Sequence, residues 1–203
     1  MRMRRGGSAA IEEVSRFFMR DDAVHRSLRR LTRTLAELGI AHAVVGGMAL
    51  VAHGYDRTTV DVDVLVTAEG LDRIHRELTG RGYLPPFEGS RNLRDTETGV
   101  RIEFLVTGQF PGDGKPKPVA FPPPEVHSVQ IDGIAYVTLL KLVELKLASG
   151  MTNPGRLKDL ADVQELIRTL ELDERFAAGL DPFVRDRFVE LVSAVREDSS
   201  ASR

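Results

Sequence analysis

The sequence predicts a mixed α/β fold, in which a central mixed sheet is flanked by helices and carries an N-terminal helix and a C-terminal helical segment. Leucines recur at spacings of three and four from Leu28 to Leu38, which is typical of one face of a helix. Valines alternate with other residues from 60 to 66, which is the period of a strand. Asp132–Gly133 separates two short apolar runs and has the residues that a two-residue hairpin turn needs.

Composition limits the classes of function. The 203 residues suffice for one domain with a proper core, and a net charge of −2 argues against a broad phosphate-tracking surface, so no bulk DNA binding is expected. The absence of cysteine excludes disulfides, thiolate catalysis and Cys-ligated zinc. No run approaches the roughly 20 apolar residues that span a bilayer. We therefore expect a cytoplasmic protein that does not contact membranes.

Four segments are predicted along the chain. Residues 1–38 form a helical segment that docks on the core, and they begin with a basic tail at Met1–Arg5. Residues 39–137 form the α/β core, and residues 138–196 form the C-terminal helical segment. Residues 197–203 are polar and terminal, and we expect them to be disordered.

The core begins with a strand, a glycine turn and a helix. Residues 41–45 are apolar, Gly46–Gly47 turns the chain, and the following helix runs to about His53. The remaining core elements are predicted as the strand over 60–66, a helix from Leu71 that ends near Gly80 or Gly82, and strands around Leu93, over 100–106, over 126–131 and over 134–137.

A loop and three helices follow from the composition of the second half. Six prolines between residues 107 and 124 leave little regular structure, and this ordered loop either closes over a substrate or is a rigid connection. Thr138 can cap a helix that runs to Ser149, with Gly150 directly behind it. The remaining two helices are predicted over 157–170 and after Asp181–Pro182.

Two aspartates form the main candidate site. Asp61 and Asp63 are separated by one residue on the predicted strand, so both carboxylates point to the same face. Hard divalent cations prefer several such oxygen ligands, which makes a metal site the hypothesis. The alternative is an edge strand with a solvated face, because alternation is also the ordinary strand pattern.

The Gly46–Gly47 turn precedes the two aspartates in the sequence and is a candidate phosphate-binding turn. Gly46 and Gly47 lack Cβ atoms, so their backbone amides can approach phosphate oxygens closely, although a tight strand-to-helix connection explains them too. Arg57 either neutralises phosphate charge or is an exposed surface residue. Thr59 shares the strand face of the aspartates.

These motifs resemble the nucleotidyltransferase superfamily related to DNA polymerase β, in particular bacterial AbiEii-like and minimal nucleotidyltransferases. The matching stretch is residues 44–50, then Gly54, Arg57, Thr59 and residues 61–65, with thirteen residues between Gly47 and Asp61. Many members have Gly-Ser where this chain has Gly46–Gly47, so the serine contact to phosphate is missing here.

The resemblance implies further site residues. Family members use a third carboxylate from a later strand, for which Glu103 is the candidate and Asp95 its rival; Glu103 also fits the open face of a hairpin strand. In a later segment of these families, basic residues face the nucleotide. The matching residues here are Lys146, Arg156 and Lys158, near Asp159 and Asp162, although solvated charges on an amphipathic helix explain them equally.

The resemblance also implies an activity. A Mg²⁺-dependent or Mn²⁺-dependent enzyme would transfer a nucleoside monophosphate from ATP or another nucleoside triphosphate to a hydroxyl of protein, RNA or a small molecule. Asp61, Asp63 and Glu103 would hold the metal and act in catalysis, while the glycine turn and the cations would bind the nucleotide. The alternatives are an inactive nucleotide-binding or partner-binding module, such as a member of a toxin–antitoxin pair with a cognate antitoxin, and a purely structural helical adaptor.

Overall fold

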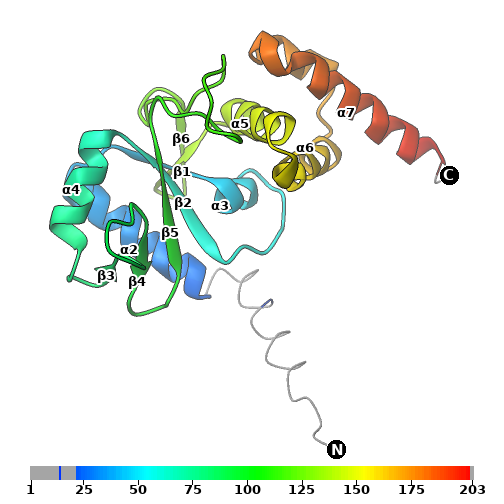
Figure 1. Ribbon diagram of the computed structural model, residues 1–203. Helices are drawn as coiled ribbons and strands as arrows, with labels where there is room; N and C mark the ends of the chain where they lie inside the picture. The colour runs from blue at the N-terminus through cyan, green and yellow to red at the C-terminus, as the bar shows by residue number, and fades with distance from the viewer. Residues whose placement is uncertain (1–13, 15–21, 202–203) are drawn as a thin grey trace, which may run out of the picture.

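Seven strands form one mixed sheet at the centre of the protein (Figure 1). The computed structural model describes residue 14 and residues 22–201. The basic tail Met1–Arg5 and the other residues before 22, apart from residue 14, lie outside the described residues. The strands are β1 His42–Val45, β2 Asp61–Val66, β3 Tyr83–Leu84, β4 Leu93–Asp95, β5 Arg101–Val106, β6 Ser128–Ile131 and β7 Ile134–Val137. Their order in the sheet is β3-β4-β5-β2-β1-β7-β6. The predicted fold class is confirmed.

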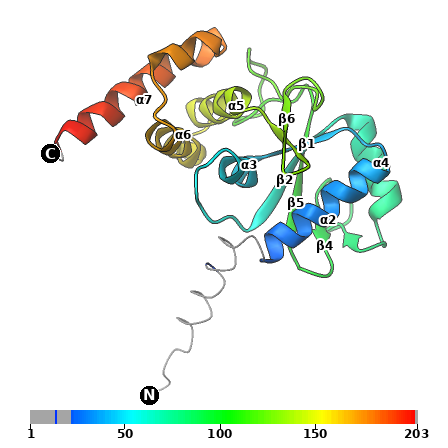
Figure 2. The same cartoon turned by 180° about the vertical axis from the view of Figure 1, so that it is seen from behind.

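Helices cover both faces of this sheet (Figures 1 and 2). On one face lie α2 and α4; on the other lie α3 and α5, with α6 and α7 packed outside α5. None of the helices in the described residues has the length and apolar character needed to cross a membrane. The helices are α2 Ala23–Glu37, α3 Gly46–Ala52, α4 Ala68–Leu78, α5 Leu139–Thr152, α6 Leu157–Thr169 and α7 Pro182–Ala201, with short 3-10 helices at Pro154–Arg156 and Glu174–Gly179.

Strand β2 presents its valines and its aspartates to opposite faces of the sheet. Val62 and Val64 are fully buried, and they alternate with Asp63, whose side chain lies against Gly46 of α3, so they point to the face of the sheet away from α3. Asp61 and Asp63 alternate with them and therefore point to the opposite face, where α3 lies. The period of two in the sequence thus places both carboxylates on one side of the sheet, as predicted.

One continuous hydrophobic core joins the N-terminal helix to the last helix. Leu28, Leu31 and Leu35 on α2 are at most 1% exposed, and Phe188 on α7 belongs to the same cluster. Gly39 follows α2 with a φ of +62°, a left-handed conformation that glycine adopts without strain. The leucine face predicted from the sequence therefore packs on this chain's own core.

The β6–β7 hairpin has the turn chemistry that its sequence predicts. Asp132 and Gly133 both have positive φ values, 51° and 76°, as a type I′ turn requires of its two central residues. The flanking strands pair antiparallel, with Ile131 opposite Ile134. This prediction is confirmed.

Two predicted helix ends are wrong, and tertiary contacts explain both. Helix α5 continues through Gly150 to Thr152, because Gly150 packs against Leu160 on α6 rather than ending the helix. Helix α7 runs to Ala201, so residues 197–201, predicted as part of a disordered tail, are helical. Arg168 of α6 bonds to Asp198 at 3.0 Å and holds this end of α7. Strand β3, only two residues long, was not predicted.

We predict that Gly150→Ala destabilises the protein, although Gly→Ala inside a helix ordinarily stabilises it by up to about 1 kcal/mol. A Cβ at position 150 would lie 2.5 Å from Leu160 Cγ, and such overpacking costs about 1–3 kcal/mol. Urea denaturation measures the change. In a Leu160→Ala background the penalty should disappear; a stabilising effect of Gly150→Ala in the wild-type background would contradict the packing explanation.

Candidate active site

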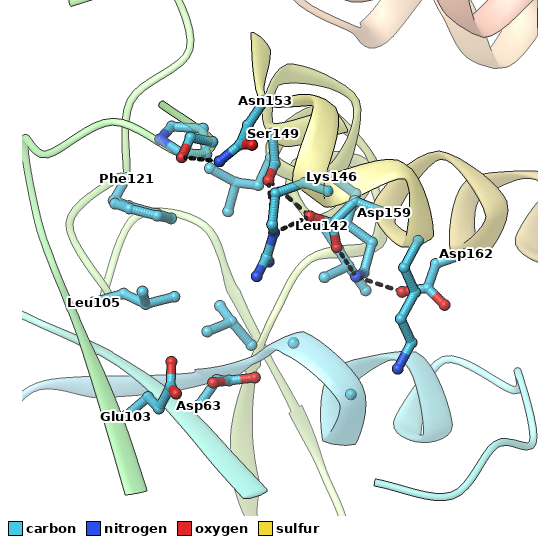
Figure 3. A pocket seen from close by; sticks show the side chains of 18 of the residues that line it. Asp63, Glu103, Leu105, Phe121, Leu142, Lys146, Ser149, Asn153, Asp159 and Asp162 are labelled. Carbon is cyan, nitrogen blue, oxygen red and sulfur yellow. Dashed lines mark hydrogen bonds and ion pairs between the residues drawn. The ribbon is translucent and has the colours of Figure 1, made fainter. Parts of the chain in front are cut away.

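All ten predicted site residues line one cavity of about 990 Å³. It lies between the carboxylate face of β2 and β5 and the helices α5 and α6, and the loop after β5 forms another wall. Figure 3 shows Asp63 and Glu103 on one side and Lys146, Asp159 and Asp162 across from them. The ten residues are Gly46, Gly47, Arg57, Thr59, Asp61, Asp63, Glu103, Lys146, Arg156 and Lys158.

The acidic side of the cavity is built by two parallel strands. Asp63 on β2 is the register partner of Glu103 on β5, and strands in a sheet lie about 4.8 Å apart, so these two side chains are neighbours. Burial raises the pKa of Asp63 to about 7, and the negative charges of Asp61 and Glu103 contribute to the shift. The three carboxylates therefore form one electrostatic unit.

The glycine turn approaches this acidic strand very closely. A Cβ on Gly46 would lie 1.8 Å from Asp63 Oδ2, and a Cβ on Gly47 would lie 2.6 Å from Thr59 Oγ1. Gly46 also has a φ of +62°. Both positions therefore require glycine for a reason the sequence did not reveal, namely contact with Asp63 on β2 and with Thr59 just before that strand. No side chain caps α3 at Val45, and the turn itself lines the cavity.

A divalent cation suits the donor set but would have to displace existing contacts. Thr59 Oγ1 donates a hydrogen bond to Asp61 Oδ1 at 2.8 Å, and Glu103 forms an ion pair with Arg101 at 2.6 Å. Among the described residues, no three His, Cys, Asp or Glu side chains are already gathered as a metal-ligand set. Asp61, Asp63 and Glu103 supply the hard oxygen ligands that Mg²⁺ and Mn²⁺ prefer, so their chemistry fits such a cation.

The cationic side of the cavity is a buried ionic network. Lys146 Nζ bonds to Asp159 Oδ1 at 2.9 Å and to Asp162 Oδ2 at 2.7 Å. Arg57 Nη1 contacts both oxygens of Asp162, at 2.9 and 3.0 Å. Arg156 Nε bonds to Asp159 Oδ2 at 2.8 Å. Lys146 is 8% exposed, so the alternative of a solvated charge is wrong for this residue.

This network connects three parts of the chain. It joins α5 through Lys146, α6 through its two aspartates, and the segment before β2 through Arg57. Burial alone would raise the pKa of Asp159, but the charge of Lys146 and a hydrogen bond from Ser149 outweigh it and lower that pKa. Asp159 therefore favours the ionised form, and both aspartates bond to the cations at the cavity wall.

The proline-rich loop is fixed along one wall of the cavity. Asn153 Nδ2 donates to Gly112 O at 3.1 Å, and Lys117 Nζ donates to Pro111 O at 2.6 Å and to Thr152 Oγ1 at 3.1 Å. Gly112 has no room for a Cβ, which would lie 2.7 Å from Ser149 O. Of the two interpretations of this loop, the contacts favour the rigid connection.

Asp95, the rival third carboxylate, lies elsewhere in the structure. It is fully buried, accepts a hydrogen bond from Ser27 at 2.8 Å and forms an ion pair with Arg30. Burial would raise its pKa, but Ser27, backbone N–H groups of the following turn and Arg30 lower it. Asp95 is not part of the cavity lining. It anchors α2 to the β4–β5 turn, and Glu103, which lines the cavity, stays the candidate for the third carboxylate.

An apolar wall of the cavity was not predicted. Leu105 and Phe121 lie on the β5 side and face Leu142 of α5 (Figure 3). Leu105 could have been found, because it follows Glu103 by two residues on one strand face. Phe121 could not, because a single aromatic residue among prolines carries no periodic signal.

Solved structures of low sequence identity resemble this fold. No family model and no curated protein matches the sequence. The fold is similar to a candidate nucleotidyltransferase of Helicobacter pylori, which is 14% identical, with a TM-score of 0.47 over 88% of this chain and 96% of that chain. It is also similar to JHP933 of Helicobacter pylori, at 16% identity and a TM-score of 0.47 over 88% and 94% of the two chains.

A third similar structure is an antigenic nucleotidyltransferase-like protein of Paracoccidioides brasiliensis, at 17% identity and a TM-score of 0.47 over 84% of this chain and 91% of that chain. At 14–17% identity and TM-scores of 0.47 the three structures show a similar fold alone, so the nucleotidyltransferase superfamily and its AbiEii-like grouping stay predictions. At these identities and TM-scores they carry no conclusion about activity. The function proposed below therefore rests on this chain's own side chains.

We predict that Lys146→Met destabilises the fold by about 3–5 kcal/mol, the usual cost of removing one partner from a buried ion pair, because it leaves two buried aspartates side by side without the lysine that bonds to both, although each keeps one arginine partner. Lys158→Met, which removes an exposed lysine of the same cavity, should change stability by less than about 0.5 kcal/mol. Denaturant unfolding compares them. Unchanged stability of Lys146→Met would mean that the network does not hold these elements together.

The pKa of Asp63 predicts a pH-dependent stability. Because this pKa is about 7 in the folded protein and about 3.8 in the unfolded chain, Asp63 favours folding at low pH, and that contribution is lost as the pH rises through 7. The free energy of unfolding of Asp63→Asn, taken relative to that of wild type, should increase by about 1–3 kcal/mol from pH 4 to pH 8. Denaturant unfolding with a chelator present measures this, with Asp72→Asn on α4 as the control for loss of one charge. An equal effect of both variants would contradict the raised pKa.

Proposed function

We propose that this protein is a divalent-cation-dependent nucleotidyltransferase, which transfers a nucleoside monophosphate from a nucleoside triphosphate to a hydroxyl of protein, RNA or a small molecule and releases pyrophosphate. One observation carries the proposal. Asp63 and Glu103 are in register on parallel strands, with Asp61 beside them and the Gly46–Gly47 turn against them. Such a carboxylate group beside a backbone turn suits phosphoryl transfer, which needs positioning and charge stabilisation.

The three carboxylates have the role of holding the cation. Asp61, Asp63 and Glu103 would bind Mg²⁺ or Mn²⁺. The pKa of Asp63 is raised first by burial and then by the negative charges of Asp61 and Glu103, and a cation would offset those charges. When bound, the cation polarises the α-phosphate and stabilises the departing pyrophosphate. Glu103 either completes the ligand set or takes the proton from the attacking hydroxyl, which requires that it leave its ion pair with Arg101.

The opposite wall supports binding of the triphosphate. Lys146, Arg57 and Arg156 are three cations paired with only two carboxylates, Asp159 and Asp162, which leaves one positive charge in excess at the cavity wall. The exposed Lys158 adds a second. We propose that Lys158 and the half-exposed Arg156 contact phosphate oxygens directly. Lys146 acts mainly through its fixed position, because two of its three N–H donors already bond to aspartates, while Arg57 bonds to Asp162 through Nη1 alone.

The Gly46–Gly47 turn is proposed to face the phosphates with its backbone. The turn lines the cavity beside Asp63, and the first N–H groups of a helix have no partner within the helix. Gly47 stands where many members of the family have serine, so this contact would depend on backbone donors alone. The steric limit set by Asp63 and Thr59 excludes a larger residue at either position.

A second candidate function is a nucleotide-binding or partner-binding module without catalysis, such as a toxin–antitoxin component that binds a cognate antitoxin. The pairing of Arg57 and Lys146 with aspartates favours it, because these cations are held by the protein itself. Cation-dependent binding of ATP or another nucleoside triphosphate, without any product, would distinguish this module from an enzyme.

We predict that Asp61→Asn lowers nucleotidyl transfer by more than about 100-fold, since even partners of metal ligands contribute 10-fold to 100-fold. The assay incubates pure protein with each labelled nucleoside triphosphate, Mg²⁺ and cell extract as the acceptor source, and it measures pyrophosphate release and label transfer. Asp72→Asn on the exposed face of α4 is the matched control and should retain full turnover. Substantial turnover by folded Asp61→Asn would refute the assigned metal site.

A further inference from the structure

One wall of the cavity is apolar, and the chemistry proposed above does not use it. Leu105 follows Glu103 by two residues on β5, so the two side chains share a face about 7 Å apart along the strand. Phe121 returns beside this strand end, because Gly108 N–H donates to Phe121 O at 2.9 Å and Phe121 N–H donates to Gln109 O at 2.8 Å. The apolar wall therefore lies directly beyond Glu103 along β5.

The apolar wall is one side of an open slot. Leu142, which is buried on α5, stands across the cavity from Leu105 and Phe121 (Figure 3). Leu105 and Phe121 pack against the core but remain partly exposed, so part of their surface faces the water in the cavity. A flat ring that enters the slot would remove that surface from water and could stack on Phe121.

We infer that Leu105 and Phe121 form the surface on which the base of the nucleoside triphosphate stacks, an inference that rests on the proposed function. The order along β5 supports this assignment. Glu103 would lie at the α-phosphate. The ribose would then span the distance from Glu103 to Leu105, which is two residues farther along β5. The aromatic ring of Phe121 lies beyond it on the same side of the cavity.

The polar groups around the wall are bonded to the protein. Asn153 Nδ2 donates to Gly112 O and its Oδ1 accepts from Gly155 N–H at 2.9 Å. Ser149 Oγ donates to Asp159 at 2.7 Å, and Gln109 Oε1 accepts from Arg91 at 3.0 Å. Strong discrimination among bases requires buried groups that bond to the edge of one base and stay unpaired with another. The wall therefore binds the ring and discriminates weakly between bases.

Calorimetric titration tests this inference on the full-length protein with Mg²⁺. The probes are ATP, GTP, CTP and UTP, with inorganic tripolyphosphate as the ligand that lacks a base. Phe121→Ala should weaken binding of all four nucleotides by about 10-fold, the scale of one base–aromatic stack, and leave tripolyphosphate binding unchanged. Phe87→Ala is the matched control, because Phe87 is exposed and lies outside the cavity lining. Wild-type affinities for the four nucleotides should agree within about 3-fold.

A second variant guards against loss of the fold. Phe121→Leu keeps an apolar side chain and removes the ring, so it should retain the wild-type melting temperature and still lose nucleotide affinity. If Phe121→Ala does not fold, Phe121→Leu is the variant that tests the stacking inference. Unchanged nucleotide binding in the folded variant overturns this inference and leaves the proposed function standing. A preference of wild type for one nucleotide by more than about 30-fold overturns the statement that the wall discriminates weakly between bases. Failure of wild type to bind any nucleotide overturns both the inference and the proposed function.

Discussion

The close approach of the Gly46–Gly47 turn to β2 is the constraint on which the site depends. β1 and β2 pair antiparallel with Val45 opposite Asp63, so the chain must turn into α3 directly against the aspartate side chain. Any Cβ at either glycine would overlap Asp63 or Thr59. The same turn brings backbone donors to the cavity and buries Asp63, which raises its pKa to about 7. A steric requirement of the fold therefore also creates the electrostatic character of the site.

The ionic network across the cavity has a complementary role. Charged residues are rarely buried unless they are paired, and here Lys146, Asp159, Asp162 and Arg57 satisfy one another while they connect α5, α6 and the segment before β2. Because Lys146 already bonds to two aspartates, its influence on a phosphate would be mainly electrostatic.

The cavity therefore consists of three surfaces with different chemistry. Carboxylates on β2 and β5 form the first, the ionic network on α5 and α6 forms the second, and the apolar wall with Leu105 and Phe121 forms the third. Residues far apart in sequence supply them, since β2 and α6 are separated by the whole of the β3–β7 region. Hydrogen bonds from Asn153 and Lys117 hold the loop after β5 in place, and this loop forms the rest of the third surface.

Local patterns in the sequence by themselves determine much of this protein. The alternation at residues 60–66 places Asp61 and Asp63 on one strand face, and Asp132–Gly133 specifies its hairpin, because side-chain periodicity and turn preferences act over a few residues. Tertiary packing decides the rest. It extends α5 through Gly150, makes Asp95 a structural anchor and turns Lys146 from an apparent surface charge into a buried ion-pair partner. Burial and pairing depend on elements that meet only in the folded chain, and the sequence around one residue does not contain that information.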